Sequence, residues 1–394
     1  MTIEKLSTDA VKIRAIAASD REAGLYAVFG EGRLFTARIG SPELREVARL
    51  DAIREIEDDP ESRWEDKELA IALYYHHPYV CVTERYGLNA ALVNLETGAV
   101  RAYKREPYHC DVSSYAAGFL DRDGRTLFIC QTAWNRLDIF DAETDACLTE
   151  REIICRNIQE GYRNEDGKWI DPVYERKNYL DYFHSLLQVA PDGQHFLSNG
   201  WVWGPMDGIL LFSTEQFLQE FEPGYYHWSY MCDGYNWDRP CAFINNDLFV
   251  IALDDALKTG NLEADEKEAY VYQQLAFIRP ADTAEAEDHR VKLYRGAVCD
   301  AFAINNGGAV QGLLYYDREK NYLVALCPLN GAGAYSLDGK TIWRLPEIKP
   351  PQSPFFSEYE SGWAYSPDGW AYSPEHHVFY TWRDGKGVAE AFYG

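Results

Sequence analysis

Two strand-end motifs at a fixed spacing constrain the fold of this 394-residue chain more than any other feature. The motifs are Asn94-Leu-Glu-Thr-Gly and Phe140-Asp-Ala-Glu-Thr-Asp, and they place Glu96 and Glu143 47 residues apart. A repeat of 40 to 50 residues is typical of propellers, in which each repeat forms one small sheet of about four strands. The spacing therefore predicts an array of similar sheets.

Two independent markers place one insertion in this array. A weaker motif copy, Phe212-Ser-Thr-Glu, puts Glu215 72 residues after Glu143, which is 25 more than the repeat. The hairpin-type Asp-Gly pairs that begin at Asp123 and Asp192 are 69 residues apart, which is 22 more than the repeat. Both excesses fall between the same two repeats. The polar segment 155–178 fits this insertion.

The strand pattern predicts an all-β fold, a seven-bladed β-propeller closed by an N-terminal strand. Short alternating segments rich in β-branched and aromatic residues recur between turn residues. Helices are expected only at 43–57 and 214–220. The last blade lacks a fourth strand, which residues 3–8 would supply, so that no sheet edge is left open. The chain 1–394 is expected to form one domain, with blades at about 9–51, 66–106, 113–153, 182–222, 236–297, 298–348 and 360–394.

On these motifs and the Asp-Gly hairpins, the chain resembles bacterial β-propeller proteins with Trp-Asp-like repeats. The resemblance covers nearly the whole chain. Such propellers mostly bind proteins, which implies a protein partner and carries no catalytic residue over to this chain. The sequence departs from the full repeat pattern because it has no Gly-His dipeptide and its Trp-Asp pair, Trp237-Asp238, lies in a loop-like stretch.

Charge and cysteine usage narrow the partners and the compartment. The chain has 63 acidic and 38 basic residues, a net charge of −25, which argues against nucleic acid and favours a basic protein partner. No stretch is long and apolar enough for a membrane span, and no signal peptide is recognisable. The nine cysteines are dispersed, which predicts neither a disulfide framework nor a zinc site and favours a reducing cytoplasm.

Four aspartates precede the expected innermost strands of different blades, so they would lie around one mouth of the central channel. Converging carboxylates could hold Ca²⁺ or another divalent cation there. The alternative, which we favour, is that each aspartate accepts backbone N–H bonds within its own turn, and that the protein needs no cofactor. The candidate metal ligands are Asp111, Asp181, Asp233 and Asp300.

Aromatic side chains near the same mouth form a candidate recognition surface. The stretch 225–238 is expected to be a surface loop between two blades, and tryptophan, tyrosine and histidine offer flat contact area with polar edges. The alternative is that these rings pack the connection onto its own blades. Trp201 and Trp203 alternate on one strand and should face the same side. The candidate binding residues are Trp134, His184, Trp201, Trp203, Tyr226, Trp228, Tyr235, Trp237 and Asp238.

We therefore expect a non-catalytic protein-binding propeller, an acidic protein of the immunity or inhibitor type or a scaffold. The motifs of serine hydrolases and zinc proteases are missing from the sequence, and no catalytic residue is predicted. The alternative is an enzyme or small-molecule binder that holds a cation at the channel mouth. In that case His109 or His184 would transfer protons beside the aspartates.

Overall fold

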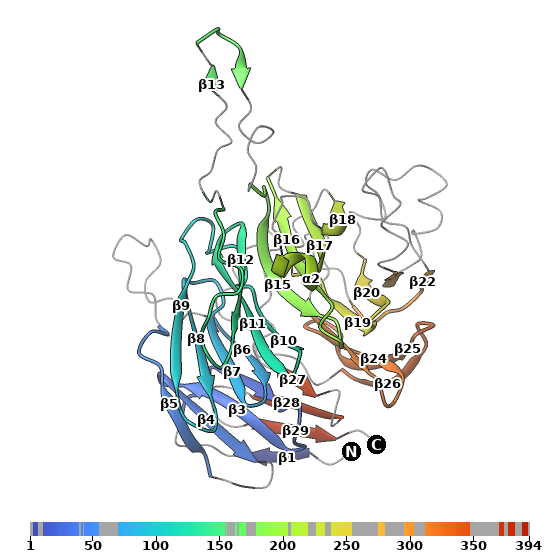
Figure 1. The fold of residues 1–394 in the computed structure, drawn as a ribbon. Helices are drawn as coiled ribbons and strands as arrows, with labels where there is room; N and C mark the ends of the chain where they lie inside the picture. The colour runs from blue at the N-terminus through green and yellow to red at the C-terminus, as the bar shows by residue number, and fades with distance from the viewer. Residues whose placement is uncertain are drawn as a thin grey trace, which may run out of the picture.

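The chain folds into small antiparallel sheets (Figure 1). The computed structural model describes residues 3–6, 11–38, 41, 43–54, 70–153, 155, 162–163, 165–170, 179–203, 206–219, 226–232, 238–253, 275–279, 295–302, 312–346, 370–373, 377–382 and 388–392. Within these residues there are six four-stranded sheets, one three-stranded sheet and one two-stranded hairpin. None of the described helices has the length and apolar character needed to cross a bilayer.

Each sheet is a meander whose strands pair with their neighbours along the chain, except that β1 joins the last sheet. The first three sheets comprise β2 (Ala15–Ala18), β3 (Leu25–Gly30), β4 (Arg33–Arg38) and β5 (Arg45–Arg49); β6 (Ile71–His76), β7 (Tyr79–Glu84), β8 (Asn89–Asn94) and β9 (Val100–Lys104); and β10 (Ala117–Arg122), β11 (Arg125–Ala133) and β12 (Arg136–Asp141). The hairpin β13 (Tyr162–Arg163) and β14 (Trp169–Ile170) follows, standing away from the sheets in Figure 1 and lying inside the predicted insertion.

The remaining sheets continue in chain order. They comprise β15 (Phe183–Val189), β16 (His195–Val202), β17 (Met206–Ser213) and β18 (Tyr226–Cys232); β19 (Cys241–Asn245), β20 (Leu248–Ala252), β21 (Leu275–Ile278) and β22 (Arg295–Ala297); β23 (Leu313–Asp317), β24 (Tyr322–Cys327), β25 (Gly331–Ser336) and β26 (Thr341–Leu345); and β27 (Trp370–Ser373), β28 (Val378–Trp382), β29 (Val388–Phe392) and β1 (Ile3–Leu6). In the last sheet β1 pairs antiparallel with β29, so strands from near both ends of the chain lie side by side (Figure 1).

Two local predictions are wrong and one is confirmed. The helix expected at 43–57 is not formed, because Arg45–Arg49 is the outer strand β5 and pairs with β4. Likewise, the stretch expected to be a loop at 225–238 contains β18, whose pairing with β17 makes it the fourth strand of its sheet. The predicted helix at 214–220 is confirmed as α2 (Thr214–Gln219).

The core lies between the sheets, as β7 illustrates. Every residue of β7 is buried. On one face Val80 and Val82 pack with Phe29 of β3, and on the other Cys81 packs with Phe128 of β11. Because side chains alternate across a strand, one strand contributes to two cores. A sheet buried on both faces depends on its neighbours, which explains the dense apolar composition of these short strands.

Candidate functional site

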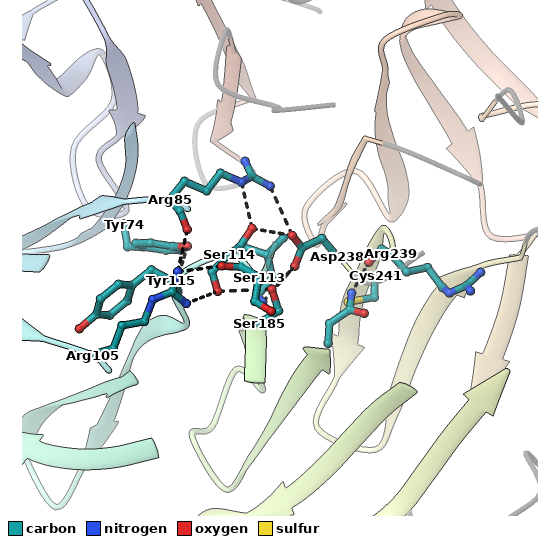
Figure 2. Close-up of polar contacts among 12 residues, drawn as sticks. Tyr74, Arg85, Arg105, Ser113, Ser114, Tyr115, Ser185, Asp238, Arg239 and Cys241 are labelled. Atoms are coloured by element: carbon teal, nitrogen blue, oxygen red, sulfur yellow. Dashed lines mark hydrogen bonds and ion pairs between the residues drawn. The ribbon is translucent and has the colours of Figure 1, made fainter. Parts of the chain in front are cut away.

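One carboxylate joins the beginnings of three sheets. Asp238 lies just before β19, and its nearly buried side chain (12% exposed) accepts hydrogen bonds from the hydroxyls of Ser114 and Ser185 and from the backbone N–H of Leu186 (Figure 2). Ser114 precedes β10, whereas Ser185 and Leu186 belong to β15. We call this side of the molecule the entrance end, because β10, β15 and β19 all begin there. The other end of these strands is the far end.

Three buried arginines lie in the neighbourhood of this carboxylate, and one of them approaches it directly. Arg85 Nε donates to Ser114 Oγ at 3.0 Å, and its Nη2 lies 3.9 Å from Asp238 Oδ2. Arg239 follows Asp238 in the chain and is 2% exposed. Arg105 is also 2% exposed, and burial lowers the pKa of its guanidinium, which nevertheless stays charged at neutral pH. Arg85 therefore lies closest to the carboxylate, whereas the Arg239 guanidinium is directed away from it and donates to the carbonyl of Ala252 at 3.1 Å (Figure 2).

Arg105 is held by neutral oxygen atoms. Its hydrogen bonds of 2.7 to 3.4 Å reach oxygens of Arg85, Gly87, Cys110, Ser113, Ser114 and Gln131. The guanidinium also lies over the ring of Tyr115, 4.9 Å from its centroid. A fully hydrogen-bonded fork of this kind fixes the loop between β9 and β10, since each donor would otherwise be buried without a partner.

A stack of aromatic rings adjoins this polar network. Phe183 lies parallel to Trp201 with 3.8 Å between ring centroids, and Trp134 lies 4.4 Å from Phe183. Trp134 comes from the β11–β12 turn, Phe183 opens β15 and Trp201 belongs to β16. The Trp201 indole N–H donates to Ser113 Oγ at 2.8 Å, and the Trp134 indole N–H donates to the carbonyl of Cys155. Buried indoles with satisfied N–H groups form a rigid base.

Three half-buried rings rest on this base and form what we call the aromatic rim: Tyr108, His109 and Trp203. His109 meets Tyr108 and Trp203 edge to face, at centroid distances of 4.5 and 4.9 Å. The exposed residues Glu106 and Asp111 flank the rim in sequence. Aromatic faces beside carboxylates suit a Lys or Arg side chain, which gains a cation–π contact and an ion pair together.

His184 follows Phe183 in β15, and its ring contacts those of Tyr182 and Phe212. It is 1% exposed, and its Nδ1 lies 2.9 Å from Ser198 Oγ. Burial lowers the pKa of His184 to about 3, although a hydrogen bond to the backbone of Asn135 acts in the opposite direction. The imidazole is therefore neutral at physiological pH and shielded from solvent.

The structure does not gather the predicted metal ligands that it describes. Asp111 is exposed, Asp181 is half-buried, and Asp300 forms an ion pair with Arg344 at 2.6 Å. Asp233 lies outside the described residues. Within the described part of the chain, no group of three or more His, Cys, Asp or Glu side chains is placed to hold a metal ion.

The predicted recognition residues divide by burial. Trp134 and Trp201 are 2% and 3% exposed and form the base, whereas Trp203 is half-buried and reaches the rim. The prediction that Trp201 and Trp203 share one side is confirmed by their ring contact, at a centroid distance of 5.4 Å. Four further predicted residues are not part of the base or of the rim as described. Tyr226 and Trp228 belong to β18, with no description of their side chains, and Tyr235 and Trp237 lie outside the described residues.

Sequence reasoning named Asp238 but missed its partners. Arg85, Arg105, Ser114 and Ser185 are far apart in the chain, and they meet only because their sheets pack side by side. A partial signal was present, since Arg85 and Arg105 each directly follow a strand of the second repeat. A charged residue at such a position, followed by an apolar strand, is a candidate for burial at a sheet junction.

Comparisons with known proteins support the fold type. No protein-family model and no curated protein sequence matches this chain. A chain from Kuenenia stuttgartiensis hydrazine synthase is similar in structure, with a TM-score of 0.54 and 11% identity over 98% of this chain and 97% of that chain. A chain from the crystal structure of the mitotic checkpoint complex has a TM-score of 0.49 and 11% identity, over 99% and 93% of the two chains. With the small antiparallel sheets, the first similarity supports a propeller-type fold and shows nothing of activity.

Proposed function

We propose that this protein is a binding module whose aromatic rim receives a basic segment of a partner protein. The observation that carries the proposal is the group of half-buried rings of Tyr108, His109 and Trp203, which the exposed residues Glu106 and Asp111 flank in sequence. Rigid aromatic anchors lose little conformational entropy on binding, and flanking charges select the partner. The net charge of −25 would speed encounter with a basic protein.

We further propose that the sheets form a closed ring of seven blades, completed by β1. Support comes from contacts between the first strands of successive sheets: β2 with β6, β6 with β10, β10 with β15, β15 with β19, and β19 with β23. The β27 strand contacts β2, and Tyr372 of β27 donates to Asp317 of β23. In such a ring the entrance end is one face, so the rim and Asp238 belong to a single binding surface.

The nature of the partner follows from the same chemistry. An acidic protein with a cation-receptive rim suits the role of an inhibitor or immunity-type protein that masks a basic protein, or of a scaffold that holds one. The cytoplasm suits the free thiols of the eight described cysteines. The alternative of a divalent cation at the channel mouth is weakened because Asp300 pairs with Arg344 and Asp111 is exposed at the rim.

The proposal is tested with Lys/Arg-rich peptides and counterparts in which the basic residues are replaced by glutamate. Basic peptides should bind, and added salt should weaken the binding. The double variant Glu106→Gln/Asp111→Asn should weaken it about tenfold, a loss of about 1.4 kcal/mol. The matched control is Asp123→Asn/Asp247→Asn, which removes two exposed charges from far-end turns. Equal losses in both variants would mean that net charge alone attracts the peptide, and the rim proposal would fail.

A further inference from the structure

A single histidine connects the last sheet to the sheet before it. His377 directly precedes β28, and both of its ring nitrogens meet carboxylates of the preceding sheet. Nδ1 contacts Asp317, the final residue of β23, and Nε2 lies 3.0 Å from Glu319 in the turn that follows. The imidazole is therefore held from two sides by a neighbouring sheet.

The carboxylate of Asp317 is the centre of this junction. Its side chain is fully buried, and it also accepts hydrogen bonds from the Tyr372 hydroxyl at 2.6 Å and from the backbone N–H of Lys320 at 2.9 Å. The rings of Tyr315 and Tyr372 add an edge-to-face contact at 5.6 Å. Polar contacts around one buried charge therefore join β23 to the last sheet, beside the apolar packing of Tyr372 with Val324 and Leu326.

The protonation state of His377 decides how many of these contacts can form. A neutral imidazole has one N–H, so it donates to one carboxylate and presents a lone pair to the other. The imidazolium ion has two N–H groups and donates to both carboxylates at once. Removing the proton would leave either Asp317 or Glu319 facing a lone pair.

We propose that His377 forms a pH-dependent link between the last sheet and the sheet of β23–β26, which we call the clasp. The clasp is engaged when the imidazole is charged and loosens when the imidazole is neutral. The last sheet contains β1 and β29, so the clasp controls the junction beside the sheet where the two ends of the chain pair. On the other side of that sheet, Ser373 Oγ donates to the carbonyl of Ser19, a contact that does not titrate.

The charges around His377 set the direction of the pH response. Among the described residues the charged groups that face it are Asp317 and Glu319. Burial alone would lower the pKa of His377, but the hydrogen bonds and negative charges of these two carboxylates outweigh burial and raise it above its ordinary value of 6.5. The stabilisation is therefore complete below pH 6.5 and is lost as the pH rises through the raised pKa.

The unmodified protein provides the first test. Histidine side-chain NMR should give His377 a pKa above 6.5 in the folded protein. Hydrogen exchange, corrected for the intrinsic rate, should show about a tenfold loss of protection at 315–321 and 377–382 between pH 6 and pH 9, with no such loss in β7 and β8. A pKa at or below 6.5, or protection that is independent of pH, would overturn the proposal.

A substitution provides the second test. His377→Gln keeps a hydrogen-bonding side chain without the charge, so the same segments should be poorly protected at pH 6 and should show no further change up to pH 9. The matched control is His195→Gln, a half-buried histidine in β16 of a different sheet, which should retain the pH response. If His377→Gln kept the wild-type response, another group would be responsible. Should the variant not fold, the measurements on the unmodified protein still decide the question.

Discussion

His184 and His377 lie at opposite ends of the propeller-type fold and in opposite electrostatic surroundings. At the entrance end His184 is buried among neutral groups, and burial lowers its pKa to about 3. At the far end burial also acts on His377, but two carboxylates outweigh it and raise its pKa. Lowering the pH therefore destabilises the fold through His184 and stabilises it through His377.

The same contrast extends to the groups around each histidine. Around Asp238, the serine hydroxyls, backbone amides and guanidinium groups keep their protons throughout the neutral pH range. At the far end a second histidine, His76, lies between Asp20 and Asp121 at 3.2 and 3.0 Å and joins three sheets. In our proposals the entrance end is a fixed platform for binding, whereas the far end responds to the protonation of His377.

The largest expected effect on stability comes from removing the Asp238 carboxylate. Asp238→Ala should lower the free energy of unfolding by about 4 kcal/mol, because it removes the negative charge beside the buried Arg85 guanidinium and the acceptor of two hydroxyls. Asp238→Asn, which keeps one oxygen and tolerates the positive φ of 66°, should cost less. Denaturant unfolding measures both.

A matched control separates the hydrogen bonds from backbone strain. Asp123 has a φ of 53° but is exposed in a far-end turn, so Asp123→Ala should cost only the left-handed strain, about 1 kcal/mol. If Asp238→Ala costs no more than Asp123→Ala, Asp238 does not tie the three sheets together.

Acidification should reveal the lowered pKa of His184 as a loss of folding stability. Between pH 7 and pH 4.5 the unfolded chain binds a proton at this histidine and the folded protein does not, so the folded state should lose about 3 kcal/mol through this group. Other groups titrate over the same range, so the measurement is the difference in unfolding free energy between the wild type and His184→Gln. This difference should shrink by about that amount on acidification. A constant difference would mean that His184 has the same pKa in the folded protein and in the unfolded chain.

The sequence predicted the repeat well because turns and strand alternation are local. The 47-residue spacing and the Asp-Gly pairs located the sheets and the insertion that contains β13 and β14. Local patterns gave a wrong prediction where a helix and an outer strand can have the same charged sequence. The acidic segment 43–57 suggested a helix, but it contains the outer strand Arg45–Arg49, and outer strands are exposed on much of their surface and can be equally polar.

The site was less predictable because its contacts are not local. The pairing of Trp201 with Trp203 followed from strand alternation alone and is confirmed. The meeting of Arg105, Ser114 and Asp238 depends on how whole sheets pack, and a single sequence carries no signal for that packing. For the same reason the sequence could not separate buried Trp134 from half-buried Trp203.

Trp203 should contribute more to peptide binding at the rim than to the stability of the fold. Trp203→Ala should weaken a Lys/Arg-rich peptide about 30-fold, or about 2 kcal/mol, as for a central aromatic anchor. The control is Trp343→Ala, which removes a half-buried indole from β26 and should leave the affinity within about twofold. Titration calorimetry measures both. Equal losses would place the peptide elsewhere.

The smallest effect tests whether the stack and the polar network form one unit. Trp201→Phe removes the N–H that donates to Ser113 Oγ while keeping an aromatic ring, and Ser113→Ala removes the acceptor. The two substitutions should be coupled by about 1 kcal/mol in a double-mutant cycle of unfolding free energies. Trp134→Phe paired with Ser113→Ala should be additive, because the Trp134 N–H donates to Cys155 instead. Additivity in both cycles would mean that the aromatic rim is supported by ring packing alone, independently of the hydrogen bonds around Asp238 and Arg85.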